Sequence, residues 1–404
     1  MRTLLITGPG GAGRTTVAAA TALAAARQGQ RVLLLSGDPG DPVAALVGGP
    51  AGPSAEVVPG LRAVPVAAGF RVARVDSGEE FRDELVALQE RGSALLGMVG
   101  ARPLGAEELT ELPGAEQFAL LRALRRAAAA PGTDLVVVDM PPLHQTVATL
   151  ALPAQLRRYL ARLLPAERQA ARALRPVLAQ LAGVPMPAQW LYEAAARWDE
   201  ELAAVQAVVE AGTTSVRLVA EPGPAAGSAL RTGALGLVLH QLGTDDLVAN
   251  RLAPADSADP WAVSVAAQQQ AFLRERDPAV PLRELPHLGR DPQGPDDLAE
   301  LCALAGGGGL APGRPGREHR AWPVEDRRAE DGVLVWAVRL PHARKDDLDL
   351  IRRGDELLLT VGPYRRIVPL PSALRRCTVS GAALAEDVLR VRFTPDPGQW
   401  PRTS

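Results

Sequence analysis

The sequence predicts an α/β protein with a doubly wound parallel sheet, followed by a small all-β sandwich. Near the N-terminus, a short apolar segment leads into a glycine-rich loop and an alanine-rich helical pattern. Strand and helix patterns then alternate along most of the chain, which is typical of a parallel sheet covered on both faces. After four consecutive glycines at 306–309, the pattern changes to short segments with alternate residues apolar, as in antiparallel sheets.

The α/β domain is expected over residues 1–305. Its strand patterns are short and almost wholly apolar, as in strands that are buried on both faces of a sheet. We expect strands at 3–7, 31–36, 134–139, 215–220, 235–239 and 247–249. We expect helices at 15–27, 79–96, 107–130, 261–275 and 295–305, and Pro113 breaks the one at 107–130.

A helical insert is expected at about 155–210, because the helical pattern there is too long for one helix between two strands. Prolines such as Pro165 and Pro176 interrupt it. Its leucines recur at helical spacing, as at Leu156, Leu160 and Leu163. Such stripes usually form a packed core, and an apolar groove for another protein is the alternative.

A flexible linker is expected at 306–320, which is rich in glycine and proline. The β sandwich is expected over 321–397. Its predicted strands are 332–340, 355–361, 366–370 and 387–393.

The composition narrows the class of protein. A net charge of −2 argues against a nucleic-acid-binding surface over the whole molecule. Cys302 and Cys377 are too far apart in sequence to indicate a thiolate zinc site or a disulfide framework, so a cytoplasmic location is expected. No apolar run approaches the roughly 18 residues that a membrane-spanning helix needs.

The segment from Gly8 to Thr16 reads GPGGAGRTT and indicates a phosphate-binding loop. It meets the pattern G-x-x-x-x-G-K-[ST] at Gly8, Gly13 and Thr15, with Arg14 in the lysine position. Glycines let backbone amides turn toward phosphate oxygens, and the following helix adds its positive N-terminal end. The alternative is a plain glycine-rich turn. The predicted phosphate-binding residues are Gly8, Gly10, Gly11, Ala12, Gly13, Arg14, Thr15 and Thr16.

Arg14 is the main departure from the loop pattern. Lys345 is the only lysine in the chain, so a general bias toward arginine explains the replacement. The two side chains still differ, because lysine carries a compact ammonium and arginine a wide planar guanidinium. We therefore expect nucleotide binding with weakened or lost hydrolysis.

Two aspartates that follow predicted strands are candidates for the chemistry. Asp38 is placed to orient a water molecule or to hold a metal-bound water. Asp139 ends a later apolar strand, where P-loop proteins place a metal-side aspartate, and the Thr15 hydroxyl is a further Mg²⁺ ligand candidate. The alternatives are a turn aspartate before proline for Asp38 and an ordinary strand-end residue for Asp139.

Five segments together resemble the anion-pump ATPase family, which contains arsenite-pump ATPases and ATPases that target tail-anchored membrane proteins. They are GPGGAGRTT at 8–16, SGDPGD at 36–41, LPG at 112–114, VDMPPLHQT at 138–146 and ANRL at 249–252. The resemblance covers about residues 1–305 in the same order. The C-terminal segment resembles an α-crystallin (small heat-shock protein) domain, which some members of the family carry.

The resemblance implies a role for each candidate residue. Asp38 would be the catalytic aspartate of the first switch segment, and Asp139 would begin the second. Thr15, Asp38 and Asp139 would lie around Mg²⁺, and Asn250 would recognise adenine. The family also implies ATP or ADP as ligand, a homodimer with the nucleotide near its interface, and an apolar groove between helical subdomains.

Pro9 is a second departure, this time from the pattern of the resembled family. There, a lysine at this position reaches the partner's nucleotide and acts like an arginine finger, which is worth ~10³–10⁵ in rate. Proline has neither a charge nor a backbone donor. The chain also lacks a CxxC motif and a cysteine cluster, so neither a zinc-bridged dimer nor an arsenite site is expected.

Three functions remain open at this point. The first is a nucleotide-binding protein that handles an apolar protein client or a membrane-protein segment, like a chaperone. The second is a dimeric scaffold that binds a partner without hydrolysing ATP. The third is an active ATPase that drives anion extrusion. No zinc, no nucleic-acid partner and no integral membrane span is expected.

Overall fold

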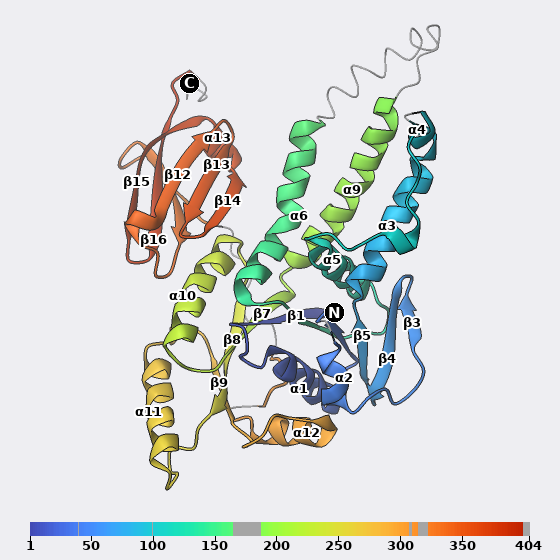
Figure 1. Cartoon of the computed structure of the whole chain (residues 1–404). Coiled ribbons are helices and arrows are strands. Elements are labelled where there is room, and N and C mark those ends of the chain that lie inside the picture. The colour runs from blue at the N-terminus through green and yellow to red at the C-terminus, as the bar shows by residue number, and fades with distance from the viewer. Residues whose placement is uncertain (39, 99, 165–186, 307–308, 314–321, 399–404) are drawn as a thin grey trace.

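The computed structural model describes residues 1–38, 40–98, 100–164, 187–306, 309–313 and 322–398. A nine-stranded sheet forms the centre of the α/β part of the chain (Figure 1). In spatial order its strands are β3 (Ala55–Val58), β4 (Leu61–Ala67), β5 (Phe70–Arg74), β2 (Val32–Ser36), β6 (Leu135–Asp139), β1 (Arg2–Thr7), β7 (Thr214–Ala220), β8 (Thr244–Leu252) and β9 (Leu282–Pro286). Only the pairs β3–β4 and β4–β5 are antiparallel, so the predicted doubly wound parallel sheet is confirmed.

Helices cover both faces of this sheet because its central strands are apolar on both sides. Leu4 and Ile6 of β1 contribute to the core on one face, and Leu5 between them contributes to the core on the other. The first face carries α1 (Arg14–Arg27), α2 (Pro42–Val47) and α12 (Gly294–Leu304). The second carries α5 (Ala115–Ala128), α6 (Leu143–Leu163), α9 (Pro187–Val209) and α10 (Pro224–Leu239).

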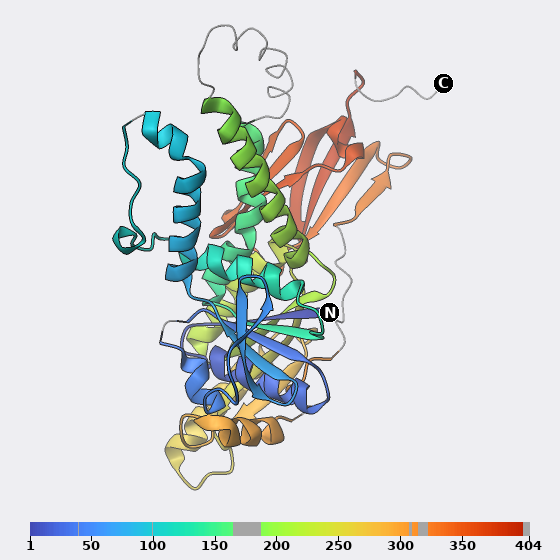
Figure 2. The ribbon, with the colours of Figure 1, turned by 90° about the vertical axis from the view of Figure 1, so that its right-hand side faces the viewer.

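Four helices form an arm that extends away from the sheet (Figures 1 and 2). This helical arm consists of α3 (Ser77–Arg91), α4 (Ser93–Met98), α6 and α9. Arg122 of α5 holds its base together, since it pairs with Glu84 of α3 at 2.9 Å and with Glu201 of α9 at 2.8 Å. Helix α11 (Pro260–Arg274) lies between β8 and β9 in sequence.

The C-terminal part is a sandwich of two antiparallel sheets, as predicted (Figure 2). One sheet contains β10 (Val324–Arg327), β11 (Val333–Arg339), β16 (Val388–Pro395) and β15 (Cys377–Ala385). The other contains β12 (Leu348–Arg353), β13 (Glu356–Val361) and β14 (Tyr364–Pro369), and the short helix α13 (Ser372–Arg375) follows it. Leu357, Leu359 and Val361 of β13 all point into the core between the sheets, which is the period-two pattern that the sequence shows.

A buried ionic cluster ties β7, β8 and β9 together. The fully buried Arg217 donates to both carboxylate oxygens of Asp246, at 2.7 and 2.8 Å, and Arg283 donates to the same carboxylate at 2.5 Å. Arg217 also donates to the backbone oxygen of Leu310 at 2.6 Å. The chain that follows α12 is therefore attached to the sheet by the same cluster.

One predicted strand is wrong. Residues 235–239 form the end of α10, because a short apolar run fits a buried helix as well as a buried strand. The tertiary packing selects the helix. A Cβ at Gly233 would lie 2.1 Å from Leu143 of α6, and one at Gly236 would lie 2.8 Å from the Tyr364 ring of the sandwich. Both glycines therefore let α10 approach its neighbours closely.

Several element bounds also differ from the prediction. Helix α5 begins at Ala115, after the LPG segment, instead of near residue 107, where only a 3₁₀ turn lies. Helix α6 begins at Leu143, well before the predicted insert at 155–210, and residues 165–186 of that insert lie outside the described residues. Strands β3, β4, β5, β9, β10, β12 and β15 were not predicted, since most carry polar residues or proline among their apolar ones.

Candidate functional site

The loop of residues 8–16 lies where β1 ends and α1 begins, at the carboxyl edge of the parallel strands. Gly11 and Gly13 have positive φ angles of 78° and 84°, a conformation that glycine adopts without steric cost. Gly8 is needed for a different reason. A Cβ there would lie 1.8 Å from the backbone oxygen of Val219 on the neighbouring β7.

Asn250 contacts the back of this loop. Its Nδ2 atom donates to the backbone oxygen of Ala12 at 2.9 Å, and a Cβ at Gly13 would lie 2.3 Å from the same nitrogen. The cavity that Asn250 shares with Gly13 and Thr16 has a volume of about 20 Å³, room for a single water. Adenine recognition by Asn250 therefore stays a prediction.

Two aspartates and two hydroxyls meet beside the start of α1. Ser36 and Asp139 are paired residues at the ends of β2 and β6, and Ser36 Oγ lies 3.4 Å from Asp139 Oδ2. Thr15 Oγ1 lies 3.5 Å from Asp38 Oδ2. The structure thus brings together the three predicted metal-side residues Thr15, Asp38 and Asp139, and it adds Ser36.

The electrostatics of this group centre on Asp139, which is 4% exposed. Burial raises the pKa of its carboxyl to about 7, with a further upward contribution from Asp38, against the opposing Thr15 hydroxyl, the Arg14 charge and the Ser36 hydroxyl. Its Oδ1 atom is buried with no hydrogen-bond partner among the described residues. A buried carboxylate oxygen without a partner destabilises the fold unless a cation or a hydrogen-bond donor binds to it.

These residues fit Mg²⁺, which takes hard oxygen ligands and keeps several waters and substrate phosphates in its coordination shell. Thr15, Asp38 and Asp139 would supply those oxygens, and the bound ion would neutralise phosphate charge. Within the described residues no group of three or more His, Cys, Asp or Glu side chains is arranged to hold a metal. A metal at this site would thus depend on hydroxyl, water or nucleotide oxygens as well.

The Arg14 side chain is turned toward the segment that follows β6. Its Nη1 atom donates to the backbone oxygen of Met140 at 2.5 Å, the residue directly after Asp139. Pro9, at the other altered position, is half-buried, and its carbonyl oxygen accepts a hydrogen bond from Ala12 N at 3.4 Å. The guanidinium is therefore bound to the segment that follows β6.

That segment, residues 140–146, is fixed against the end of β1. Thr7 Oγ1 and Thr146 Oγ1 lie 2.9 Å apart, and both hydroxyls donate to the backbone oxygen of Pro141. Leu143 N donates to the oxygen of Gly8 at 3.0 Å, which joins the start of α6 to the loop. Helix α6 therefore starts from the candidate site itself.

Four residues of this arrangement were not singled out from the sequence: Ser36, Thr7, Thr146 and Arg251. Arg251 donates to the backbone oxygen of Gly11 at 3.1 Å and has a positive φ of 58°. Ser36 and Thr7 share a signal that could have been used, since each is a polar residue at the carboxyl end of an apolar strand. Thr146 and Arg251 lie within the segments 138–146 and 249–252 that carry the family resemblance, but the sequence assigned neither of them a role.

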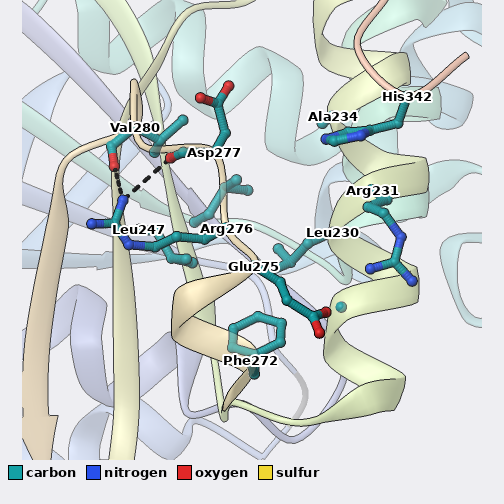
Figure 3. A pocket seen from close by; sticks show the side chains of 12 residues that line it. Leu230, Arg231, Ala234, Leu247, Phe272, Glu275, Arg276, Asp277, Val280 and His342 are labelled. Carbon is teal, nitrogen blue, oxygen red and sulfur yellow. Dashed lines mark hydrogen bonds between the residues drawn. The ribbon is translucent and has the colours of Figure 1, made fainter. Parts of the chain in front are cut away.

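Other cavities lie away from the loop. One of about 110 Å³ lies between α10 and the end of α11 (Figure 3), where Leu230 and Phe272 form apolar walls and Arg231 and Glu275 lie at the rim. Another of about 280 Å³ lies between α3, α5 and α9. Among the described helices, none combines the length and the apolar character needed to cross a bilayer.

The fold and the loop define the class of this protein. A glycine-rich loop between β1 and α1, with two aspartates at the ends of neighbouring strands, is the arrangement of P-loop nucleotide-binding proteins. Comparison with protein families gives the narrower assignment. The family described as anion-transporting ATPase matches residues 1–301, and an HSP20-like domain found in ArsA matches residues 331–393. The chain therefore belongs to the anion-transporting ATPase family and carries an HSP20-like domain.

Similar proteins cover both parts of the chain. An uncharacterized protein of Streptomyces coelicolor is 57% identical over 405 residues, with 100% of both chains covered. A putative arsenical pump-driving ATPase of Aquifex aeolicus is 23% identical over 399 residues, which cover 97% of this chain and 99% of its own. The ATPase GET3 of Paracoccidioides lutzii is 23% identical over 185 residues, which cover 46% of this chain and 52% of its own. The family implies the use of a nucleotide and Mg²⁺.

Proposed function

We propose that the protein binds ATP or ADP with Mg²⁺ at the loop of residues 8–16 and handles an apolar protein segment in the manner of a chaperone. In this proposal hydrolysis is slow or absent, because Pro9 and Arg14 stand where the family pattern has lysines. The protein works as a homodimer in the cytoplasm, with the nucleotide near the interface. Asp38 is the catalytic aspartate for any residual hydrolysis.

The contact between Arg14 and Met140 is the observation that carries the loss of hydrolysis. A lysine at this position of a P-loop reaches the β- and γ-phosphates. The Arg14 guanidinium donates instead to the backbone oxygen of Met140. This charge-assisted hydrogen bond, worth about 1.5–3 kcal/mol, holds the guanidinium at Met140 and opposes its movement toward a phosphate. Pro9 adds no charge to replace it.

The apolar cavity at the base of the helical arm supports the client part of the proposal. Leu85 and Leu88 of α3, Phe118 of α5 and Trp198 of α9 line it. Leu112, at the edge of the same cavity, is 60% exposed. An apolar segment of another protein would cover this surface, and helices with one apolar face are suited to such contacts.

Nucleotide binding is tested by titrating the protein with a fluorescent ATP analogue, with and without Mg²⁺. Saturable binding that is tighter with Mg²⁺ is expected, because Thr15, Asp38 and Asp139 supply oxygen ligands near the loop. The Asp139→Asn variant should lose most of the Mg²⁺ effect. If the analogue does not bind in either condition, the nucleotide part of the proposal is wrong.

Hydrolysis is tested by steady-state ATPase assays of the wild type, Arg14→Lys, and the double variant with Pro9→Lys and Arg14→Lys. Little or no turnover is expected in the wild type, and turnover should appear in the double variant, where both cations are restored. Turnover in the wild type equal to that of the double variant would show that Arg14 replaces lysine in function, and would favour the active ATPase.

The dimeric scaffold without hydrolysis is the second candidate, and the same Arg14 contact favours it. The two candidates differ in how a client responds to nucleotide. The chaperone-like function requires that the affinity for an apolar peptide changes on addition of Mg²⁺-ATP, whereas a scaffold binds its partner equally with and without it. Fluorescence anisotropy with a labelled apolar peptide, measured in both conditions, separates them.

A further inference from the structure

A cavity of about 360 Å³ lies where the helical arm meets the β sandwich. Its walls come from α6, the ends of α9 and α10, and strands β13 and β14. The sandwich lies beside α6 and α10 in the ribbon (Figure 1). This volume is in the range of pockets that take small molecules, roughly 300–1,000 Å³. The lining residues begin at Leu150 and none of them belongs to the loop of residues 8–16, so the cavity is a separate candidate site.

Four arginines line this cavity, and two of them have carboxylate partners. Arg157 donates to Asp199 at 2.9 Å, and Arg158 donates to both oxygens of Glu356 at 2.9 Å. These two pairs neutralise the α6 side of the cavity. They also fix the guanidinium groups in place, so that their remaining donors stay on the cavity wall.

The other two arginines, Arg365 and Arg366 of β14, form no ion pair within the described residues. Arg365 is exposed and donates only to Thr360 Oγ1, at 3.3 Å. Arg366 donates to the backbone oxygen of Leu239 at 2.5 Å and lies over the Trp322 ring, 5.4 Å from its centroid. Burial lowers the pKa of Arg366, although the charge of Glu210 opposes that effect.

His240 also lines this cavity. Burial and the neighbouring Arg366 charge lower the pKa of His240 to about 3, so the imidazole is neutral at pH 7. The lining as a whole carries an excess of positive charge, because its four arginines outnumber its two carboxylates, Glu210 and Glu356. Guanidinium groups bind carboxylate and phosphate oxygens through pairs of parallel hydrogen bonds.

We propose that this interdomain cavity binds a small anion with two or more negative charges, a polycarboxylate or a phosphate ester, through Arg365 and Arg366. The bound anion lies between the sandwich and the helical arm, and it strengthens the contact between them. This site goes beyond the proposed nucleotide function and does not depend on it. The ligand is recognised by its charge and its oxygen acceptors.

The test is isothermal titration of citrate, and separately of inorganic phosphate, into the full-length protein. Saturable citrate binding is expected in the wild type. The Arg365→Gln variant should bind at least about tenfold more weakly, since hydrogen bonds to charged groups are worth about 1.5–3 kcal/mol. The Arg365→Gln, Arg366→Gln double variant should lose citrate binding. Phosphate also suits the loop of residues 8–16, so only the difference between wild type and variants assigns phosphate to this cavity.

Arg390→Gln is the matched control, because Arg390 is an exposed arginine of β16 in the other sheet of the sandwich. It removes the same charge and should leave citrate binding unchanged. The proposal is overturned if the wild type does not bind citrate, if Arg365→Gln binds it as the wild type does, or if Arg390→Gln weakens binding equally. Arg366 also contacts α10, so Arg365→Gln carries the test if the double variant misfolds.

Discussion

Single residues at the loop show that the same amino acid can be required for different reasons. Gly11 and Gly13 supply positive φ angles, whereas Gly8 supplies space against the backbone of β7. Gly10 has neither requirement, since its φ is not positive and a Cβ there would meet nothing within 4 Å. The motif pattern treats these positions as one glycine-rich loop, and only the geometry separates them.

The Gly8→Ala substitution should therefore be strongly destabilising, and Gly10→Ala should be nearly neutral. The added methyl group at Gly8 would overlap the oxygen of Val219, and such overpacking typically costs about 1–3 kcal/mol. Urea unfolding of the two variants beside the wild type measures the difference. Equal midpoints for the two variants would contradict this account of the loop.

Asp139 should make the stability of the nucleotide-free protein fall as the pH rises. Its pKa is about 7 in the folded state, above the ordinary aspartate value of 3.8, so the folded protein binds the proton more tightly than the unfolded chain. The stability that protonated Asp139 contributes is present in full below about pH 4, and it is lost as the pH rises through about 7. Asp139→Asn removes it, so this variant should melt higher than the wild type at pH 8 and close to it at pH 4.

Thermal unfolding in EDTA over pH 4–8 measures this difference. The other titrating groups are the same in both proteins, so their contributions cancel when the variant is compared with the wild type. A difference between variant and wild type that stays constant across this pH range would contradict the raised pKa of Asp139.

Among the elements, the strands β7, β8 and β9 depend on the ionic cluster as well as on apolar packing. Burial alone would raise the pKa of Asp246, but the charges and hydrogen bonds of Arg217 and Arg283 lower it. The carboxylate therefore stays charged between two guanidinium groups. Removing it would leave two cations in a buried place without their partner.

The Asp246→Asn substitution should cost about 3–5 kcal/mol in the free energy of unfolding, because it breaks a buried ion pair. Asp134→Asn is the contrasting change. Asp134 pairs with Arg31 at 2.7 Å, but their side chains are 43% and 60% exposed, so a much smaller loss is expected because solvent screens the pair. Denaturant unfolding of both variants checks the ranking. Similar losses in the two would show that burial does not set the value of these pairs.

In the molecule as a whole, α6 connects the candidate nucleotide site to the β sandwich. It begins at Leu143, whose amide donates to Gly8, and near its other end Arg158 and Arg162 both pair with Glu356 of β13. Tyr364 of β14 packs on Gly236 of α10 in the same region. One helix therefore has contacts both with the nucleotide loop and with the sandwich.

Glu356→Gln should loosen the contact between the sandwich and the arm. The two arginine pairs are partly exposed, so a loss of about 1 kcal/mol is expected, which corresponds to roughly fivefold faster local opening. Hydrogen exchange at the end of α6 and in β14 measures it. Glu330→Gln is the control. It removes an exposed carboxylate of the sandwich domain that pairs with Arg327, and it should leave the hydrogen exchange of these segments unchanged.

The phosphate-loop pattern and the two strand-end aspartates could be predicted from the sequence, because each is identified by residues that are adjacent in the chain. A glycine pattern after an apolar strand identifies the loop, and the carboxyl ends of parallel strands bring Asp38 and Asp139 to one edge. The alternating sandwich strands were readable for the same local reason, as β11, β13 and β16 show.

The tertiary structure alone decided what Arg14, Asn250 and residues 235–239 do. Arg14 binds Met140 and Asn250 binds Ala12, and each pair is separated by more than 100 residues in the chain. The apolar run at 235–239 ends a longer helix, α10, and Gly236 within it lets that helix lie against Tyr364 of the sandwich. Such contacts form only after distant segments have packed, so no local pattern of residues specifies them.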